Sequence, residues 1–215
     1  MKILIACEYS GAVRDAFIKQ GHDVMSCDLL PTDSPGPHYQ GSVFDVINDG
    51  WDMMIAHPPC TYLAVSGNRW LYNKDKSRNE ERWKNREEGL DFVRALMNAP
   101  IEKIAIENPV SCISSEIRKP DQIIQPWQFG DEAQKTTCLW LKNLPNLKPT
   151  KIVGKGEFTT FKSGKRHPKW YADALATAKT KAERQKLRSK TFQGIADAMA
   201  EQWGAEKTTK QLELL

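Results

Sequence analysis

The sequence predicts an α/β fold in which a largely parallel sheet is covered by helices on both faces. Three short apolar runs, at 2–7, 53–56 and 104–106, lack the polar alternation of a half-exposed strand. Strands of a parallel sheet that are buried on both faces have this continuous apolar character. Segments with helical spacing separate the runs, and such alternation of strands with helices is typical of a parallel sheet.

Length and composition indicate one soluble unit. The 215 residues, 40% hydrophobic and 27% charged, suffice for one α/β domain with a small appendage. No apolar run reaches the roughly 20 residues of a membrane helix, and the first seven residues read as a strand rather than a signal peptide. The five cysteines and four histidines show no metal-ligand spacing. We therefore expect a cytoplasmic monomer with reduced thiols, no metal and no membrane association (host cytoplasm, if it is phage-encoded).

The first part of the chain reads as strand, turn, helix, strand and acid. The strand at 2–7 is followed by a helical pattern that ends at Gln20, where Gly21 is a natural stop. A second strand at 23–27 then ends in Asp28. An acid in this position typically accepts a ribose hydroxyl in nucleotide-binding sheets. The G-x-G-x-x-G pattern is absent, so a dinucleotide site is only weakly indicated.

Residues 31–41 hold three prolines and two glycines, which predicts a loop. Asp45 follows a brief turn after that loop. Two interpretations of Asp45 stay open. It is either an acceptor for an adenine amino group at the end of a third strand, or an ordinary acid at the start of a helix.

Two predicted strands end in residues whose side chains can take part in a reaction. The run at 53–56 leads into His57-Pro58-Pro59-Cys60, and the run at 104–106 leads into Glu107-Asn108-Pro109. Two prolines stiffen the backbone and prevent the sheet from continuing. The carboxyl ends of strands in an open α/β sheet border the ligand site, so we expect a thiol and a carboxylic acid to face one cleft. The alternative is a Pro-Pro loop with an incidental thiol.

The rest of the chain supplies further elements and a basic segment. We expect a mobile lid at 61–70, a helix at 77–98, strands at 123–124 and 136–141, and a last helix that begins at 191–194. The domain boundaries are expected to be a catalytic core at 1–150, a basic insertion at 151–190, a returning helix at 191–204 and a polar tail at 205–215.

The insertion at 151–190 is strongly basic. It has a net charge of +9, whereas the remainder of the chain sums to −5, and it includes four aromatic residues. Basic and aromatic residues together favour a phosphate-bearing partner such as nucleic acid. The alternative is a solvated helix face rich in lysine.

Together these motifs resemble those of the DNA (cytosine-5)-methyltransferases, in that family's order and over most of the chain. Residues 6–11 resemble the family's glycine-rich S-adenosylmethionine loop. Pro58-Pro59-Cys60 resembles its Pro-Pro-Cys nucleophile loop, and Glu107-Asn108-Pro109 resembles its Glu-Asn-Val motif. The chain looks like a compact, phage-type member that lacks the large target-recognition domain.

The resemblance implies a Rossmann-like, S-adenosylmethionine-dependent methyltransferase with Cys60 and Glu107 as catalytic residues. The cofactor contacts that it implies are Cys7, Glu8, Tyr9, Ser10, Gly11, Asp28, Leu29, Asp45, Val46, Pro58, Thr191 and Phe192. The substrate contacts that it implies are Pro59, Ser66, Asn108, Lys135, Lys162, Lys165, Arg166, Lys169 and Trp170. The implied partner is double-stranded DNA with a flipped cytosine, and the implied role is restriction-modification or anti-restriction.

Several positions depart from the family's pattern. His57 replaces a glycine, Thr61 a glutamine and Pro109 a valine. Where the family carries a Gln-x-Arg-x-Arg strand, the basic candidate here is Lys135. Without the large recognition domain, we expect low sequence specificity.

The implied chemistry joins a thiolate to an acid. The Cys60 thiolate would add to carbon 6 of cytosine, and a protonated Glu107, kept neutral by burial, would neutralise the charge at nitrogen 3. Three other functions stay open: methylation of an amino group (N4 of cytosine or N6 of adenine), methylation of a free cytosine nucleotide, and non-catalytic binding of nucleic acid. Amino-methylating enzymes have Asp or Asn before the prolines and an aromatic after them, where this chain has His57 and Cys60.

Overall fold

A computed structural model describes residues 1–189 and 191–205. Its centre is a seven-stranded sheet in the order β3-β2-β1-β4-β5-β7-β6, in which β7 runs opposite to the other strands. The strands are β1 (Lys2–Ala6), β2 (Asp23–Asp28), β3 (His38–Gln40), β4 (Met53–Ala56), β5 (Lys103–Asn108), β6 (Gln122–Ile124) and β7 (Thr137–Lys142). The predicted α/β fold class, a largely parallel sheet with helices on both faces, is confirmed.

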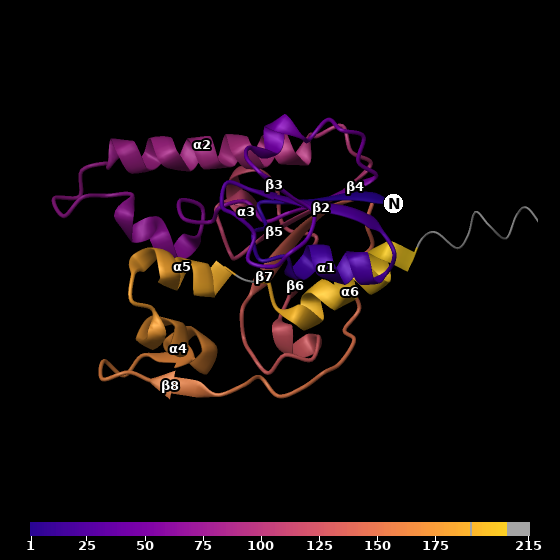
Figure 1. Ribbon diagram of the computed structural model, residues 1–215. Coiled ribbons are helices and arrows are strands. Elements are labelled where there is room, and N and C mark those ends of the chain that lie inside the picture. Colours follow the sequence, from indigo (N-terminus) through magenta and orange to yellow (C-terminus); the bar gives the residue numbers. More distant parts are fainter. Residues whose placement is uncertain (190, 206–215) are drawn as a thin grey trace, which may run out of the picture.

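Helices cover both faces of this sheet (Figure 1). The helices are α1 (Ala12–Lys19), α2 (Glu80–Met97), α3 (Ile113–Glu116), α4 (Lys169–Thr177), α5 (Lys181–Ser189) and α6 (Gln193–Gly204). Short 3₁₀ turns are η1 (Val43–Asp45), η2 (Val65–Trp70) and η3 (Pro126–Gln128). Helix α2 lies on one side of the sheet, and α1 and α6 lie together on the other.

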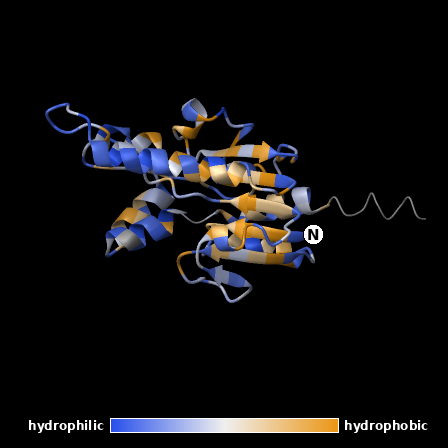
Figure 2. Ribbon diagram, turned by 90° about the horizontal axis from the view of Figure 1, so that it is seen from above, coloured by the Kyte–Doolittle hydropathy of each residue, from blue (hydrophilic) through white to orange (hydrophobic). Residues whose placement is uncertain are grey.

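The core is divided by the sheet into two apolar layers, because successive side chains of a strand point to opposite faces. In β1, Ile3 and Ile5 pack in the layer of α1 and α6, whereas Leu4 and Ala6 pack in the layer of α2. All four are fully buried. Figure 2 shows strands that are largely hydrophobic and helices that carry both hydrophilic and hydrophobic residues. This burial on both faces explains the continuous apolar runs in the sequence.

Two predicted boundaries are corrected. The helix expected at 77–98 begins only at Glu80, because the side chain of Asn79 accepts a hydrogen bond from the Arg82 N–H and caps the first turn. The loop expected at 31–41 contains β3, a three-residue edge strand that pairs in parallel with β2. So short a strand, next to prolines, has no periodicity to reveal it.

Residues 151–189 form a unit beside the main sheet (Figure 1). It consists of the antiparallel hairpin β8 (Phe158–Thr160) and β9 (Arg166–Pro168), followed by α4 and α5. The chain then returns to the core as α6. A Cβ at Gly194 would lie 1.8 Å from the Phe129 carbonyl oxygen, so this start of α6 requires glycine. Lys190 and residues 206–215 of the expected tail lie outside the described residues.

No helix in the described part of the chain is long and apolar enough to cross a membrane.

Candidate active site

The sheet has one topological switch point, between β1 and β4. From β1 the chain proceeds outward through β2 and β3, and it then returns to the other side of β1 with β4. Loops that leave adjacent strands in opposite directions open a crevice at the carboxyl edge of the sheet, where open α/β proteins bind ligands. The two loops at this crevice are 7–11, here named the β1 loop, and 57–60, here named the β4 loop.

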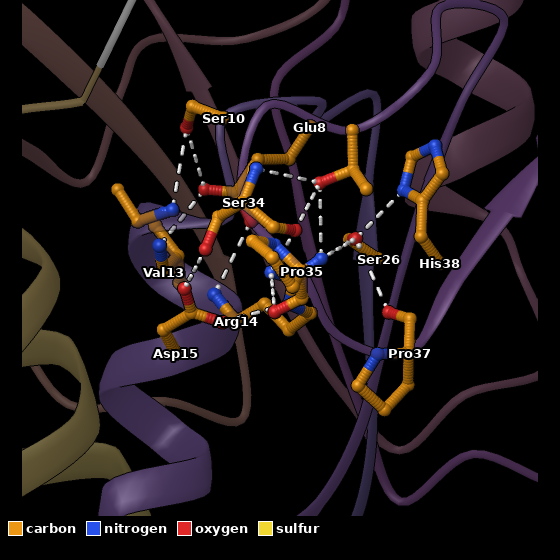
Figure 3. A network of polar contacts seen from close by, with 12 residues as sticks. Glu8, Ser10, Val13, Arg14, Asp15, Ser26, Ser34, Pro35, Pro37 and His38 are labelled. Atoms are coloured by element: carbon orange, nitrogen blue, oxygen red, sulfur yellow. Dashed lines mark hydrogen bonds and ion pairs between the residues drawn. The ribbon is translucent and has the colours of Figure 1, made fainter.

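The β1 loop is closed by its own carboxylate. Glu8 is buried, and its carboxylate accepts hydrogen bonds from the N–H groups of Val13 at 2.8 Å and Arg14 at 3.2 Å (Figure 3). The Ser10 hydroxyl donates to the same carboxylate at 3.2 Å. Glu8 therefore occupies the amino end of α1, the position that holds phosphate in many nucleotide-binding folds. A pyrophosphate placed there would meet a carboxylate.

Arg14 anchors the neighbouring segment 31–37 to the β1 loop. It is fully buried, and its guanidinium donates to the Ser34 carbonyl at 2.9 Å, with further bonds to Ser26, Thr32, Pro35 and Asp15 (Figure 3). Sequence reasoning missed this residue. Its only signal is an arginine next to Val13 on the side of α1 that turns to the core.

Asp28 lies at the carboxyl end of β2, as predicted, and is half-buried. Its carboxylate accepts a hydrogen bond from the Leu30 N–H at 2.9 Å. Burial raises the pKa of Asp28, and the bond from Leu30 and the nearby His38 only partly oppose this. Leu29, the next residue, is exposed. A recessed acid at this point is compatible with a bound hydroxyl, and its role stays a prediction.

Asp45 is the last residue of η1, and it forms a capping box with Ser42, which precedes the turn. Its carboxylate accepts hydrogen bonds from the Ser42 N–H at 3.2 Å and from the Tyr39 hydroxyl at 3.1 Å. The geometry is that of a helix-start acid, one of the two interpretations left open, and an adenine contact stays a prediction. The side chain of Val46 is buried in the core layer that includes Trp51.

The β4 loop, which carries the predicted thiol, lies next to the strand end that carries the predicted carboxylic acid. Strands β4 and β5 are parallel neighbours, with Ala56 opposite Ile106, so the loops that carry Cys60 and Glu107 leave the sheet side by side. The Asn108 amide donates to the Pro58 carbonyl at 2.8 Å and ties the two loops together. Cys60 is exposed. Adjacent placement of the two strand ends is confirmed.

Glu107 has a partner that the sequence did not predict. His57 Nδ1 lies 3.1 Å from Glu107 Oε2, and both side chains are only 12% exposed. Burial pushes the pKa of Glu107 upward, but the hydrogen bond from His57 and the positive charge of Lys135 outweigh it, so the pKa lies below its usual value. The expectation that burial keeps Glu107 protonated is therefore wrong for the protein without substrate.

The Cys60 thiol is shifted in the opposite direction. Desolvation and the Glu107 carboxylate raise the pKa of Cys60, and the charges of Lys135 and Arg188 oppose this only in part. Near neutral pH the thiol is therefore mostly protonated in the absence of substrate. Lys135 was predicted at this site, whereas Arg188 of α5 was not.

Helix α5 lies against the β1 loop, although about 180 residues separate them in the chain. The Tyr9 hydroxyl donates to the Lys186 carbonyl at 2.9 Å and lies 2.7 Å from the Ser189 hydroxyl. Lys186 also forms an ion pair with Asp33. The carboxyl end of the basic unit therefore adjoins the candidate site and is not a separate appendage.

The other predicted contacts of the basic unit divide into two groups. Lys162, Lys165 and Arg166 are exposed on the hairpin. Lys169 is also exposed but pairs with Asp173 at 2.9 Å. The Trp170 indole N–H donates to the Gln134 carbonyl at 3.0 Å, and its ring meets the edge of Phe192. Protein contacts thus fix the position of Trp170, and its contact with the substrate stays a prediction.

The remaining predicted residues lie in three separate segments. Ser66 is exposed in η2, and Pro59 is exposed in the β4 loop. Thr191 and Phe192 are half-buried and line a cavity of about 320 Å³ with Trp170, Leu187 and residues of α4. The described residues include no group of three or more His, Cys, Asp or Glu side chains that could hold a metal.

No protein-family model matches the sequence, and no curated protein matches it. One similar solved structure is a prophage-encoded E. coli protein, provisionally described as a DNA modification methyltransferase. It is 16% identical with a TM-score of 0.47, and the match covers 72% of this chain and 52% of that chain. The chain thus spans about half the length of that protein.

Proposed function

We propose that the protein is an S-adenosylmethionine-dependent methyltransferase that acts on carbon 5 of cytosine in DNA, with Cys60 as nucleophile. The observation that supports this most is the joined pair of strand ends, in which the Asn108–Pro58 bond holds the Cys60 and Glu107 loops together. A thiol beside a carboxyl group suits addition to an unsaturated ring followed by protonation of that ring.

The crevice residues fit the proposed cofactor better than a dinucleotide. Glu8 fills the amino end of α1, which leaves no anion position there for a pyrophosphate. Asp28 and the β1 loop would hold the nucleoside part, with Asp45 further along the edge. When bound, S-adenosylmethionine supplies an electrophilic methyl group. The carboxylates of Asp28, which is half-buried, and Asp45, which is exposed, suit its positive charge and its hydroxyl groups.

The residues of the chain perform the activation. Once ionised, the Cys60 sulfur adds to carbon 6 of cytosine, and negative charge develops on the ring. Glu107 donates a proton to nitrogen 3 and neutralises that charge. The paired prolines and the bond from Asn108 fix the position of the sulfur before the base arrives, which reduces the entropy lost on the way to the transition state.

The hairpin supports DNA as the substrate. Its exposed Lys162, Lys165 and Arg166 would contact phosphates, so DNA affinity should fall as salt is added. The slope of log affinity against log salt is negative, and replacing all three with alanine should reduce its magnitude by about 2.7, at roughly 0.9 per phosphate contact. A matched triple replacement of Lys74, Lys76 and Lys84, exposed cations outside the basic unit, should change the slope less. An unchanged slope in the hairpin variant would remove these residues from the interface.

Analysis of the methylated product tests the proposed function. Purified protein is incubated with unmethylated DNA and S-adenosylmethionine, and the digested nucleosides are identified by mass spectrometry. We expect 5-methylcytosine from the wild type and from the control Cys112→Ser, and none from Cys60→Ser. N4-methylcytosine or N6-methyladenine would favour the amino-methylating alternative. Product from deoxycytidine monophosphate but not from DNA would favour a free nucleotide, and no product from either would favour non-catalytic binding.

A further inference from the structure

The pair formed by His57 and Glu107 is unusual in leaving one ring nitrogen unused. His57 Nδ1 lies 3.1 Å from Glu107 Oε2, while His57 Nε2 is buried and has no hydrogen-bond partner among the described residues. Buried polar atoms almost always have partners, so an unpaired ring nitrogen in a crevice points to a function that requires the imidazole. His57 also stands where the resembled family has glycine, so the pattern of that family does not account for it.

The proton of this hydrogen bond belongs to the imidazole. The pKa of Glu107 lies below its usual value, so the carboxylate is the acceptor and His57 Nδ1 is the donor. The other titratable groups facing the pair are Asp28 at the end of β2, Lys135 before β7, Cys138 in β7, and Cys60 in the same loop. Glu107 thus enters the reaction without the proton that its proposed role requires.

We propose that His57 supplies the proton that Glu107 delivers to nitrogen 3 of cytosine, an inference that rests on the proposed function. As the Cys60 sulfur forms its bond to carbon 6, the electron pair displaced through the ring reaches nitrogen 3. Glu107 takes the Nδ1 proton of a doubly protonated His57 and passes it to nitrogen 3, so the N–H bond of the imidazolium breaks as the N–H bond of the ring forms. The result is a neutral imidazole, a carboxylate and an N–H on the ring. The same proton returns along this path when the sulfur leaves.

The imidazole suits this task better than the nearby ammonium. Lys135 lowers the pKa of Glu107 through its charge. His57 is hydrogen-bonded directly to the Glu107 carboxylate and is therefore the group placed to pass it a proton. The buried position of the pair, with each side chain 12% exposed, limits exchange of the proton with water.

A spectroscopic test examines the pair independently of any reaction. In protein labelled with ¹⁵N-histidine, the His57 Nδ1 proton should be visible and protected from solvent, and it should be identified by its loss in His57→Asn. Replacing Glu107 with Gln should shift this signal, whereas replacing the exposed Glu88 should not. A His57 Nδ1 without a proton in the wild type would overturn the inference, whether or not DNA is the substrate.

A kinetic test separates proton supply from positioning. The asparagine amide of His57→Asn can still donate to Glu107 but cannot release a proton. With DNA containing 5-fluorocytosine, we expect this variant to form the covalent adduct about 100-fold more slowly than the wild type at pH 7.5, the scale of general acid catalysis. The gap should narrow as the pH falls, because water then protonates Glu107. Affinity for DNA should be unchanged, and His22→Asn, at the opposite edge of the sheet, should react like the wild type.

Three results of the kinetic test would each overturn one of the two proposals. Equal rates for His57→Asn and the wild type at every pH would overturn the inference while leaving the proposed function intact. A gap that does not change with pH would mean that His57 only positions Glu107, and it would also overturn proton supply. A wild type that forms no adduct at all would overturn the proposed function itself.

Discussion

The β1 loop and the β4 loop leave neighbouring parallel strands at the same edge of the sheet, yet they differ in how completely their polar groups are hydrogen-bonded. In the β1 loop, the Glu8 carboxylate and the adjoining Arg14 guanidinium are buried within dense hydrogen bonding. In the β4 region, His57 Nε2 and Asn108 Oδ1 have no hydrogen-bond partner among the described residues, and Cys60 is exposed.

This difference indicates that one loop supports the site and that the other reacts. Polar groups that satisfy one another make a rigid wall for a ligand site. Polar groups that are buried and unsatisfied cost stability, and they persist where a ligand or a reaction uses them. We infer that the β1 loop shapes the crevice and that the β4 loop performs the chemistry. Changes in the first should therefore affect folding, and changes in the second should affect reaction.

Arg14→Met should produce the largest change in stability. The substitution keeps a long apolar stem but removes the Arg14 donor from the Pro35 carbonyl and leaves the Ser34 carbonyl with the Thr32 hydroxyl alone. We expect the free energy of unfolding to fall by about 3 kcal/mol, as for other broken buried polar networks. Arg94→Met, at a more exposed arginine paired with Asp91, should cost less than about 1 kcal/mol. Urea unfolding measures both, and equal effects would refute the contrast between the loops.

Asp28→Ala tests the cofactor side of the crevice. Loss of a charge-assisted hydrogen bond to a ribose hydroxyl should weaken binding of S-adenosylmethionine by about 1–2 kcal/mol. Calorimetry on the variant and on Asp52→Ala, an exposed acid at the opposite edge of the sheet, provides the comparison. Unchanged affinity in Asp28→Ala would remove this carboxylate from the cofactor site.

Alkylation of Cys60 with iodoacetamide should reveal a smaller effect, on the thiol itself. Because the pKa of Cys60 is raised above its ordinary value of 9.0, the thiolate fraction and the rate should still increase with pH beyond that value. Glu107→Gln removes a negative charge that raises this pKa, so the variant should react roughly twofold to tenfold faster at pH 8. Glu88→Gln serves as the control. A rate that levels off near neutral pH would show that the thiol is already ionised.

Much of the site could be predicted from local sequence. The apolar runs identified the central strands because both faces of the sheet are buried, and the motifs at 57–60 and 107–109 identified the strand ends. What escaped prediction depends on distant contacts. The pairing of His57 with Glu107, the contact of Tyr9 with α5 and the network around Arg14 each join segments that no local pattern relates. β3 escaped because three residues at an edge carry too little pattern.

The protonation state of Glu107 also could not be predicted from the sequence. Burial alone, which a strand end suggests, would raise the pKa of Glu107. The structure shows that a hydrogen bond and a nearby cation reverse the sign. A side chain's position can therefore be inferred from sequence more readily than its protonation state, because the latter depends on every charge within a few ångströms.

Covalent trapping tests the central claim, that the β4 loop carries the nucleophile. Duplex DNA containing 5-fluorocytosine is incubated with the protein and S-adenosylmethionine, and the adduct is digested and mapped by mass spectrometry. Fluorine on carbon 5 cannot leave as a proton does, so the enzyme should remain bound to the base. We predict a single cross-linked peptide attached through Cys60, severely slowed formation in Glu107→Gln and none in Cys60→Ser. An adduct at another cysteine, or none with the wild type, would contradict the assignment.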